Sequence, residues 1–379
     1  MIRVLIVEDS ATMRHHLRAA LAEEPDLEVV GEAHDGADAV QLCGRLRPDV
    51  VTMDMMLPTM SGLAATEDIM ADHPTPILVV SSADRRELFS TYDALAAGAV
   101  EVLEKPRGDD SDADWARRLR AAVRLVSRIR VITHPRARLD GRRRGPQGTP
   151  APGAPTPAQQ STRPAPAGRA HGPAPAGQAR WSALQVVCVG ASTGGPGALA
   201  ELLRALPDGF RTPVLCVQHI AASEPFAVAF SDWLADHSGR AVSYAVDGMV
   251  LAELTGRVLL APPDRHLLVQ DGVLRLSTAP PRQSCRPAVD VLFESAASYG
   301  RAAAGCLLTG MGRDGADGLL LMRRAGAVTF AQDEATSVVY GMPREAAALG
   351  AAMHLLSPAA IATRLGELAD AADPAGPGR

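Results

Sequence analysis

The sequence predicts an α/β protein made of two doubly wound parallel-sheet domains that are joined by a disordered linker. Three observations lead to this fold class. Continuous apolar runs alternate with helical segments in residues 1–130 and again in residues 182–369, as in parallel sheets covered by helices on both faces. Residues 131–181, rich in Pro, Ala, Gly and Arg, bury too little apolar surface to offset the entropy of ordering. Residues 370–379 are expected to form a flexible tail.

The first domain alternates short apolar strands with helical segments. Strands are predicted over Arg3–Val7, Asp49–Met53 and Ile77–Val80, and a fourth strand ends at Lys105. Strands and helices in this order form a parallel sheet through right-handed crossovers. The helices between the strands are expected over Ala11–Glu23, Gly36–Leu46, Gly62–Ala71, Glu87–Ala97 and Asp112–Arg130.

Each of these four strands ends in a polar side chain. Because ligands bind at the carboxyl ends of strands in open α/β sheets, these side chains should converge on one edge. Carboxylates gathered there repel one another unless a cation lies among them, and hard oxygen ligands suit Mg²⁺. The strand ends carry, in chain order, Glu8 with Asp9, then Asp54, Ser81 and Lys105.

Lys105 is the only lysine among the 38 basic residues of the chain. A lysine offers a compact point charge, whereas an arginine offers a wide planar fork, so a narrow pocket around a small anion can require the lysine. We therefore expect Lys105 to balance the charge of an anion carried on one of the nearby carboxylates.

The pattern resembles the receiver domain of two-component signalling proteins, over roughly residues 1–125. The resemblance implies a flavodoxin-like fold in which Asp54 accepts a phosphoryl group from a histidine kinase. It also implies that Ser81 bonds a phosphate oxygen and that Lys105 pairs with the phosphoryl group. The implied Mg²⁺ ligands are Glu8, Asp9, Asp54 and the backbone carbonyl of Met56.

The second domain opens with an apolar run that leads into a glycine-rich turn. Leu184–Val189 precedes the G-x-S-x-G sequence Gly190–Gly194, and a helix is predicted over Ala198–Leu206. A strand, a sharp turn and a helix in this order can expose the hydroxyl of Ser192 above the sheet edge. The glycines also fit a dinucleotide-binding loop, but no acidic residue follows about 20 residues later. A P-loop is excluded because no lysine ends the turn.

A serine nucleophile needs a base, and the base needs an acid that orients it. His219 follows the apolar run Val214–Val217, which places it on the same edge as Ser192. His266 is a second candidate base, ranked below His219 because it precedes an apolar strand.

The candidate acid lies in a glycine-rich loop after the apolar strand Gly305–Thr309. Four glycines surround Asp314, which allows close backbone approach and leaves N–H groups free to bind an oxyanion. Asp317 competes for the same role, although it also fits an acidic residue at the start of the helix expected over Leu319–Ala325.

The second domain, over roughly residues 184–369, resembles the catalytic domain of the CheB family of chemotaxis receptor methylesterases. The resemblance implies a Rossmann-like α/β fold in which Ser192 is the nucleophile, His219 the general base and acid, and Asp314 the orienting acid. The backbone N–H of Met311 would bind the oxyanion. The matching stretches are Val189–Pro196, Gln218–Ile220, Cys285–Phe293, Leu308–Gly315 and Gln332–Ala346.

The two resemblances together imply a phosphorylation-activated serine hydrolase of chemotaxis adaptation. It would remove methyl groups from glutamate methyl esters on the cytoplasmic helices of methylated chemoreceptors, and deamidate specific receptor glutamines. The esterase reaction would need no cofactor. Two alternatives stay open: a non-enzymatic response regulator with a protein-binding output domain, and a methylesterase that serves a non-chemotaxis signalling array. The chain departs from the family pattern after His219, over Ile220–Phe226, and over Ala261–His266, so substrate choice is open.

Charge and composition argue against several other classes of partner. The net charge of −5 over 379 residues gives no general attraction to nucleic acid, and the arginines at 136–144 fit a solvated linker. No apolar stretch reaches the roughly 20 residues of a membrane span, and no signal peptide opens the chain. The five cysteines lack metal-binding spacing. We expect a cytoplasmic monomer that neither binds nucleic acid nor inserts into a membrane.

Overall fold

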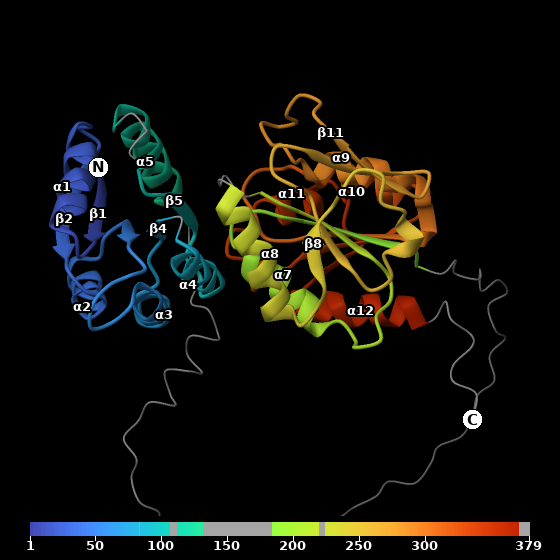
Figure 1. The fold of residues 1–379 in the computed structure, drawn as a ribbon, viewed down its shortest axis with the longest axis horizontal. Helices are drawn as coiled ribbons and strands as arrows, with labels where there is room; N and C mark the ends of the chain where they lie inside the picture. Colours follow the sequence, from blue (N-terminus) through green and yellow to red (C-terminus); the bar gives the residue numbers. More distant parts are fainter. Residues whose placement is uncertain (83, 107–111, 130, 132–183, 220–223, 371–379) are drawn as a thin grey trace, which may run out of the picture.

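The computed structural model contains two parallel α/β sheets with helices packed against their faces (Figure 1). The structure describes residues 1–370 except 83, 107–111, 130, 132–183 and 220–223. The predicted class of two doubly wound α/β domains is confirmed. The expected disordered linker and tail lie almost wholly outside the described residues, so both stay predictions, as do the domain limits.

The first sheet has five parallel strands in the order β2-β1-β3-β4-β5. Serine or aspartate side chains cap three of the helices that cover it, because Ser10, Asp35 and Ser61 each accept a hydrogen bond from a backbone N–H of the first turn. The elements are β1 (Ile2–Val7), α1 (Ala11–Ala22), β2 (Leu27–Ala33), α2 (Gly36–Leu46), β3 (Val50–Met53), α3 (Gly62–Asp72), β4 (Ile77–Ser81), α4 (Arg85–Ala96), β5 (Glu101–Glu104) and α5 (Asp112–Val126).

Two elements of the first domain differ from expectation. The edge strand β2 was not predicted, since Glu28, Gly31 and Glu32 interrupt its apolar residues and most of the strand is only half buried. The last helix ends at Val126 rather than at residue 130. Its final turn tightens there, because the N–H of Ile129 bonds to the carbonyl of Val126, three residues back.

The second sheet has seven parallel strands in the order β14-β13-β12-β6-β7-β9-β8, beside a separate hairpin of β10 and β11. The helix after β6 begins three residues earlier than expected, at Gly195, because Gly194 turns the chain with φ of 76° and a proline follows in the first turn. The elements are β6 (Val186–Ala191), α7 (Gly195–Ala205), β7 (Val214–Gln218), α8 (Glu224–Ser238), β8 (Val242–Tyr244), η2 (Leu251–Glu253), β9 (Val258–Leu260), β10 (His266–Gln270), β11 (Val273–Ser277), α9 (Val289–Ala296), η3 (Ala297–Ala302), β12 (Ala303–Leu307), α10 (Ala316–Arg324), β13 (Val328–Gln332), α11 (Met342–Ala348), β14 (His354–Leu356) and α12 (Pro358–Asp370).

Strand β6 lies in the middle of the second sheet, between β12 and β7. The register pairs Gly190 of β6 with Leu307 of β12, and Ala191 of β6 with Gln218 of β7. All three strands run in the same direction, so the loops that follow them leave the sheet side by side. This arrangement brings three segments that are far apart in the sequence to one edge.

Helix α4 of the first domain packs against α7 and α8 of the second domain (Figure 1). One apolar cluster includes Leu88 and Tyr92 of α4 together with Phe226, Phe230 and Trp233 of α8. The Tyr92 hydroxyl donates a hydrogen bond of 2.7 Å to the carbonyl oxygen of Phe226. Because each fully buried aromatic side chain contributes roughly 2 kcal/mol, this contact is a substantial interface between the domains.

Candidate functional sites

An acidic pocket lies at the carboxyl edge of the first sheet. Carboxylate oxygens of Glu8, Asp9 and Asp54 lie within 4.8 Å of one another, and the first and last of these residues are buried. The Lys105 Nζ lies 3.1 Å from Glu8 Oε2 and 2.9 Å from Asp54 Oδ1. The predicted convergence of side chains from β1, β3 and the end of β5 is therefore present.

Ser81 and Met56 also lie beside this pocket. The backbone N–H of Met56 donates to Asp54 Oδ1 at 3.4 Å. The Ser81 hydroxyl lies 2.8 Å from Thr91 Oγ1 on α4, and the Ser81 carbonyl accepts from the Lys105 N–H. The Ser81 side chain is thus bonded to α4 and not to Asp54.

Burial and charge shift the pKa values of two groups in the pocket. Burial, with the neighbouring Asp54 carboxylate, raises the pKa of Glu8 to about 7 although Lys105 opposes it. Burial acts to lower the pKa of Lys105, but Asp54 and Glu8 outweigh it, so this pKa lies above its ordinary value. A divalent cation among the three carboxylates would favour their charged forms, and an all-oxygen donor set suits Mg²⁺.

The second candidate site begins with a histidine–carboxylate pair at the edge of the second sheet. His219 Nε2 lies 2.9 Å from Asp314 Oδ2, and Asp314 is 3% exposed. The backbone N–H groups of Val289 and Asp290, at the start of α9, donate to the same carboxylate at 2.7 and 3.0 Å. The Asp314 carboxylate is therefore held in place from two sides.

The glycine-rich turn after β6 places Ser192 beside this pair. Its N–H donates to the carbonyl of Thr309, and the N–H of His219 donates to the carbonyl of Ala191, both at 3.0 Å. Gly310 abuts the serine so closely that a Cβ there would lie 2.7 Å from Ser192 Cβ. Within the described residues, no hydrogen bond joins the Ser192 hydroxyl to the imidazole.

The loop that follows Gly310 carries the other predicted site residue, Met311. Its side chain packs, with Val339, against an apolar cluster of the first domain that includes Leu103 and Leu119. The loop beside Ser192 is therefore in contact with the first domain as well as with the nucleophile turn.

Comparison with known proteins identifies the two domains. Residues 187–365 match the family model described as CheB methylesterase, and residues 4–112 match the response regulator receiver domain. A protein-glutamate methylesterase/protein-glutamine glutaminase of Anaeromyxobacter dehalogenans is 41% identical over 97% of this chain and 97% of its own length. A second such protein from the same organism is 44% identical over 96% of this chain and 98% of its own length.

The chain belongs to the CheB methylesterase family. The predicted receiver and methylesterase domains, and the predicted hydrolase class, are confirmed. Among solved structures, the catalytic domain of the Thermotoga maritima CheB methylesterase is 34% identical with a TM-score of 0.46, and covers 48% of this chain and 98% of that one. In the described part of the chain, no helix is both long and apolar enough to span a bilayer.

In this CheB-family chain, His219 and Asp314 each shift the pKa of the other toward its charged form. Burial acts to lower the pKa of His219, but the bonds to Asp314 and Cys285 raise it to about 9. Burial acts to raise the pKa of Asp314, but His219 and the N–H groups of α9 hold it below its ordinary value. These shifts favour an imidazolium beside a carboxylate, and a histidine in that form must lose a proton before it can act as a base.

His266 and Asp317, the other candidates for the base and the orienting acid, make different contacts in the structure. His266 is 1% exposed, with Nδ1 accepting from the Ala288 N–H and Nε2 lying 3.2 Å from the carbonyl oxygen of Pro280, so neither nitrogen is available to a substrate. Asp317 forms an exposed ion pair of 2.9 Å with Arg313. The geometry therefore favours His219 and Asp314.

Sequence reasoning missed three residues that organise the site. Gln218 Nε2 donates to the carbonyls of both Ser192 and His219, at 2.8 and 2.9 Å, and thereby links the nucleophile turn to the histidine. Asp290 Oδ1 accepts from the N–H groups of residues 315 and 318 and holds the Asp314 loop on α9. Cys285 Sγ lies 3.9 Å from His219 Nδ1. Gln218, Asp290 and Cys285 all lie in the matching stretches, but only the fold shows what they touch.

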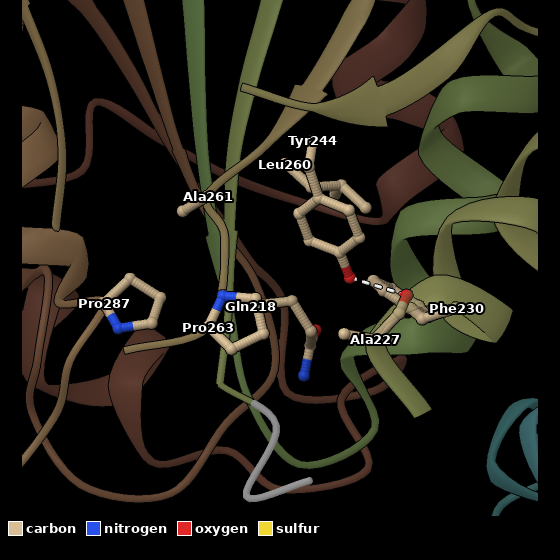
Figure 2. A pocket seen from close by; sticks show the side chains of 8 residues that line it. All are labelled: Gln218, Ala227, Phe230, Tyr244, Leu260, Ala261, Pro263 and Pro287. Carbon is tan, nitrogen blue, oxygen red and sulfur yellow. Dashed lines mark hydrogen bonds between the residues drawn. The ribbon is translucent and has the colours of Figure 1, made fainter. Parts of the chain in front are cut away.

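A mainly apolar pocket lies beside the end of β7 (Figure 2). Its lining includes Gln218, Tyr244 and Pro263, and the Tyr244 hydroxyl donates to the carbonyl of Ala227 on α8. Pro263 comes from the segment that departs from the family pattern, so this departure lies close to the catalytic edge. Residues 220–223, in the other departure, lie outside the described residues.

Proposed function

We propose that this chain is a phosphorylation-activated protein-glutamate methylesterase and protein-glutamine glutaminase that acts on chemoreceptors in chemotaxis adaptation. The observation that carries the proposal is the partly buried His219–Asp314 pair beside the Ser192 turn in a chain of this family. A pure binding module has no need of an imidazole and a carboxylate held at a serine turn, so the geometry supports an enzyme over a non-enzymatic regulator. The expected setting is the cytoplasm.

The first half of the reaction acylates the serine. His219 takes the Ser192 proton through Nδ1, because Nε2 is bonded to Asp314. The serine oxygen attacks the γ-carbonyl carbon of the glutamyl methyl ester, and the Met311 N–H stabilises the oxyanion. The imidazolium then protonates the leaving methoxide, so methanol departs and an acyl-enzyme remains.

Water completes the reaction. His219 removes a proton from the water, which attacks the acyl carbon, and the serine oxygen recovers its proton as the glutamate leaves. A receptor glutamine would form the same acyl-enzyme and release ammonia in place of methanol. Asp314 keeps the imidazole in one tautomer and stabilises the imidazolium throughout. No step needs a cofactor.

The receiver domain would control access to this site. Asp54 would accept a phosphoryl group from a histidine kinase, and Mg²⁺ bound by Glu8, Asp9, Asp54 and the Met56 carbonyl would neutralise the charge of the phosphoryl group during transfer. Lys105 would remain paired with the new anion. The phosphoryl group carries about −1.5 to −2 charge, which would attract the Ser81 hydroxyl away from Thr91 on α4.

The decisive test is the Ser192→Ala variant of the full-length chain. Methanol release from methylated receptors should fall by about 10⁴-fold or more, because the covalent step is lost. Labelling with a serine-reactive phosphonate should mark Ser192 in the wild type and disappear in the variant. Methanol release at the wild-type rate from a correctly folded variant would remove Ser192 from the mechanism.

A further inference from the structure

Cys285 is a thiol at the catalytic edge that the proposed mechanism does not use. It is half exposed, whereas the other four cysteines, at 43, 188, 216 and 306, are buried. A tight turn holds it in place: the N–H of Cys285 donates to the carbonyl of Arg282, and the N–H of Arg282 donates back, at 2.8 and 3.0 Å. The turn presents Sγ to His219.

The thiol and the neighbouring histidine can serve as two ligands of one transition-metal ion, and a carboxylate lies beside them. One ligand atom from each of His219, Cys285 and Asp314 lies within 4.8 Å of the other two. Thiolate and imidazole together suit Zn²⁺, whose bonds to nitrogen and sulfur are about 2.0 and 2.3 Å long. At a tetrahedral or slightly wider angle such ligand atoms lie roughly 3.5 to 4 Å apart, and His219 Nδ1 lies 3.9 Å from Cys285 Sγ.

Asp314 completes the arrangement without leaving its present place. Zinc-binding histidines usually donate their second ring N–H to a carboxylate, which fixes the tautomer and strengthens the metal-binding nitrogen. Here Nε2 faces Asp314 Oδ2 at 2.9 Å, which leaves Nδ1 turned toward the thiol. The ring is therefore already oriented as a metal ligand.

We propose that the pair of His219 Nδ1 and Cys285 Sγ binds a thiophilic divalent cation such as Zn²⁺, and that this binding inhibits the esterase. The thiol proton and any proton on Nδ1 are released as the metal binds. The metal then occupies the lone pair that would accept the Ser192 proton. The inhibition rests on the proposed function, whereas the binding does not. Mg²⁺ is a hard cation and would not compete for this site.

The test separates binding from inhibition. Co²⁺ added to the full-length chain should give a thiolate-to-cobalt charge-transfer band, and Zn²⁺ should abolish that band by displacement. In the Cys285→Ser variant the band should be absent. A band of equal strength in the variant, or none in the wild type, would overturn the proposal. An Asp54→Asn variant should keep the band, which excludes the acidic pocket of the receiver as its source.

Activity is measured on the unphosphorylated chain without Mg²⁺, relative to each protein's own metal-free rate. Zn²⁺ should lower methanol release by the wild type at least about 100-fold, since the general base is blocked, and a chelator should restore it. Zn²⁺ should lower methanol release by the Cys285→Ser variant much less. Equal inhibition of both proteins contradicts the inhibitory site. A wild type that releases no methanol even after phosphorylation contradicts the proposed function instead, and leaves the cobalt result to decide on binding.

If the Cys285→Ser variant fails to fold, a measurement on the wild type alone still tests the proposal. Zn²⁺ should protect Cys285 from alkylation by iodoacetamide, read by mass spectrometry of the peptide that contains it. An alkylation rate unchanged by saturating Zn²⁺ would show that the metal does not bind the thiol.

Discussion

At the scale of single residues, the proposed esterase site contains one buried carboxylate. Asp314 is 3% exposed, yet its charge is compensated by His219 and by two backbone N–H groups of α9. A buried carboxylate with these partners stays ionised, and so it can stabilise the imidazolium that forms in each half of the reaction.

Asp314→Asn should therefore lower kcat by about 10³-fold or more, because the amide has no charge and can hold the wrong tautomer. Asp317→Asn is the matched control, since Asp317 lies three residues away in an exposed ion pair with Arg313. Methanol-release kinetics with both variants check the assignment. A large loss in the Asp317 variant with little loss in the Asp314 variant would reverse the two roles.

The raised pKa of His219 sets the pH dependence of catalysis. A base works only without its proton, so kcat/KM should rise with pH and level off above about 9. At pH 7, two units lower, only about one imidazole in a hundred is neutral. Measurement of kcat/KM between pH 6 and 10 checks this prediction. A plateau that starts near the ordinary histidine value of 6.5 would contradict the His219–Asp314 pairing in solution.

At the scale of elements, helix α4 touches both the receiver pocket and the second domain. Thr91 on this helix bonds to the Ser81 hydroxyl, and the next residue, Tyr92, bonds to the Phe226 carbonyl on α8. Asp93 accepts from the Trp233 indole N–H at 2.7 Å. A shift of Ser81 toward a phosphoryl group would remove one bond of α4 on the receiver side, next to the residues that hold the esterase domain.

Tyr92→Phe should raise methanol release in the absence of a phosphodonor. The change leaves the buried Phe226 carbonyl without its donor, which weakens the interface by about 1–2 kcal/mol, and basal activity should rise up to roughly 30-fold. Tyr244→Phe is the matched control, because the Tyr244 hydroxyl donates to the next α8 carbonyl, that of Ala227, from within the esterase domain. If both variants release methanol at the same altered rate, the domain interface does not restrain the esterase.

At the scale of the whole molecule, two separate charge clusters perform different tasks. The acidic pocket of the receiver gathers three carboxylates and one lysine, whereas the esterase site holds one compensated histidine–carboxylate pair. We propose that the first takes up a phosphoryl group, and the second lies beside the Ser192 turn. The two domains touch through α4 and through the packing of Met311 and Val339 on the first domain, and through these contacts the first cluster can influence the second.

Asp54→Ala should leave methanol release at the basal rate and unresponsive to a phosphodonor, because the acceptor oxygen is gone. Wild-type activity should rise on addition of a small-molecule phosphodonor with Mg²⁺. Asp72→Ala, at the exposed end of α3, should still respond. Equal stimulation of the wild type and the Asp54 variant would place the phosphorylation site elsewhere.

The sequence by itself determined the order of strands and turns and the residues that end them. Apolar runs followed by polar side chains predicted the edges that carry Glu8, Asp54, Ser192 and His219, because strand periodicity and turn chemistry are local properties. The edge strand β2 escaped this reasoning, since a half-buried edge strand needs no continuous apolar run.

Only the tertiary structure decided which of these side chains act on one another. It paired Asp314 rather than Asp317 with His219, joined Gln218 to the backbone carbonyls of Ser192 and His219, and turned Cys285 toward the imidazole. These contacts join residues up to 95 positions apart in the chain. Their geometry follows from how strands and helices pack together, which local patterns along the sequence do not encode.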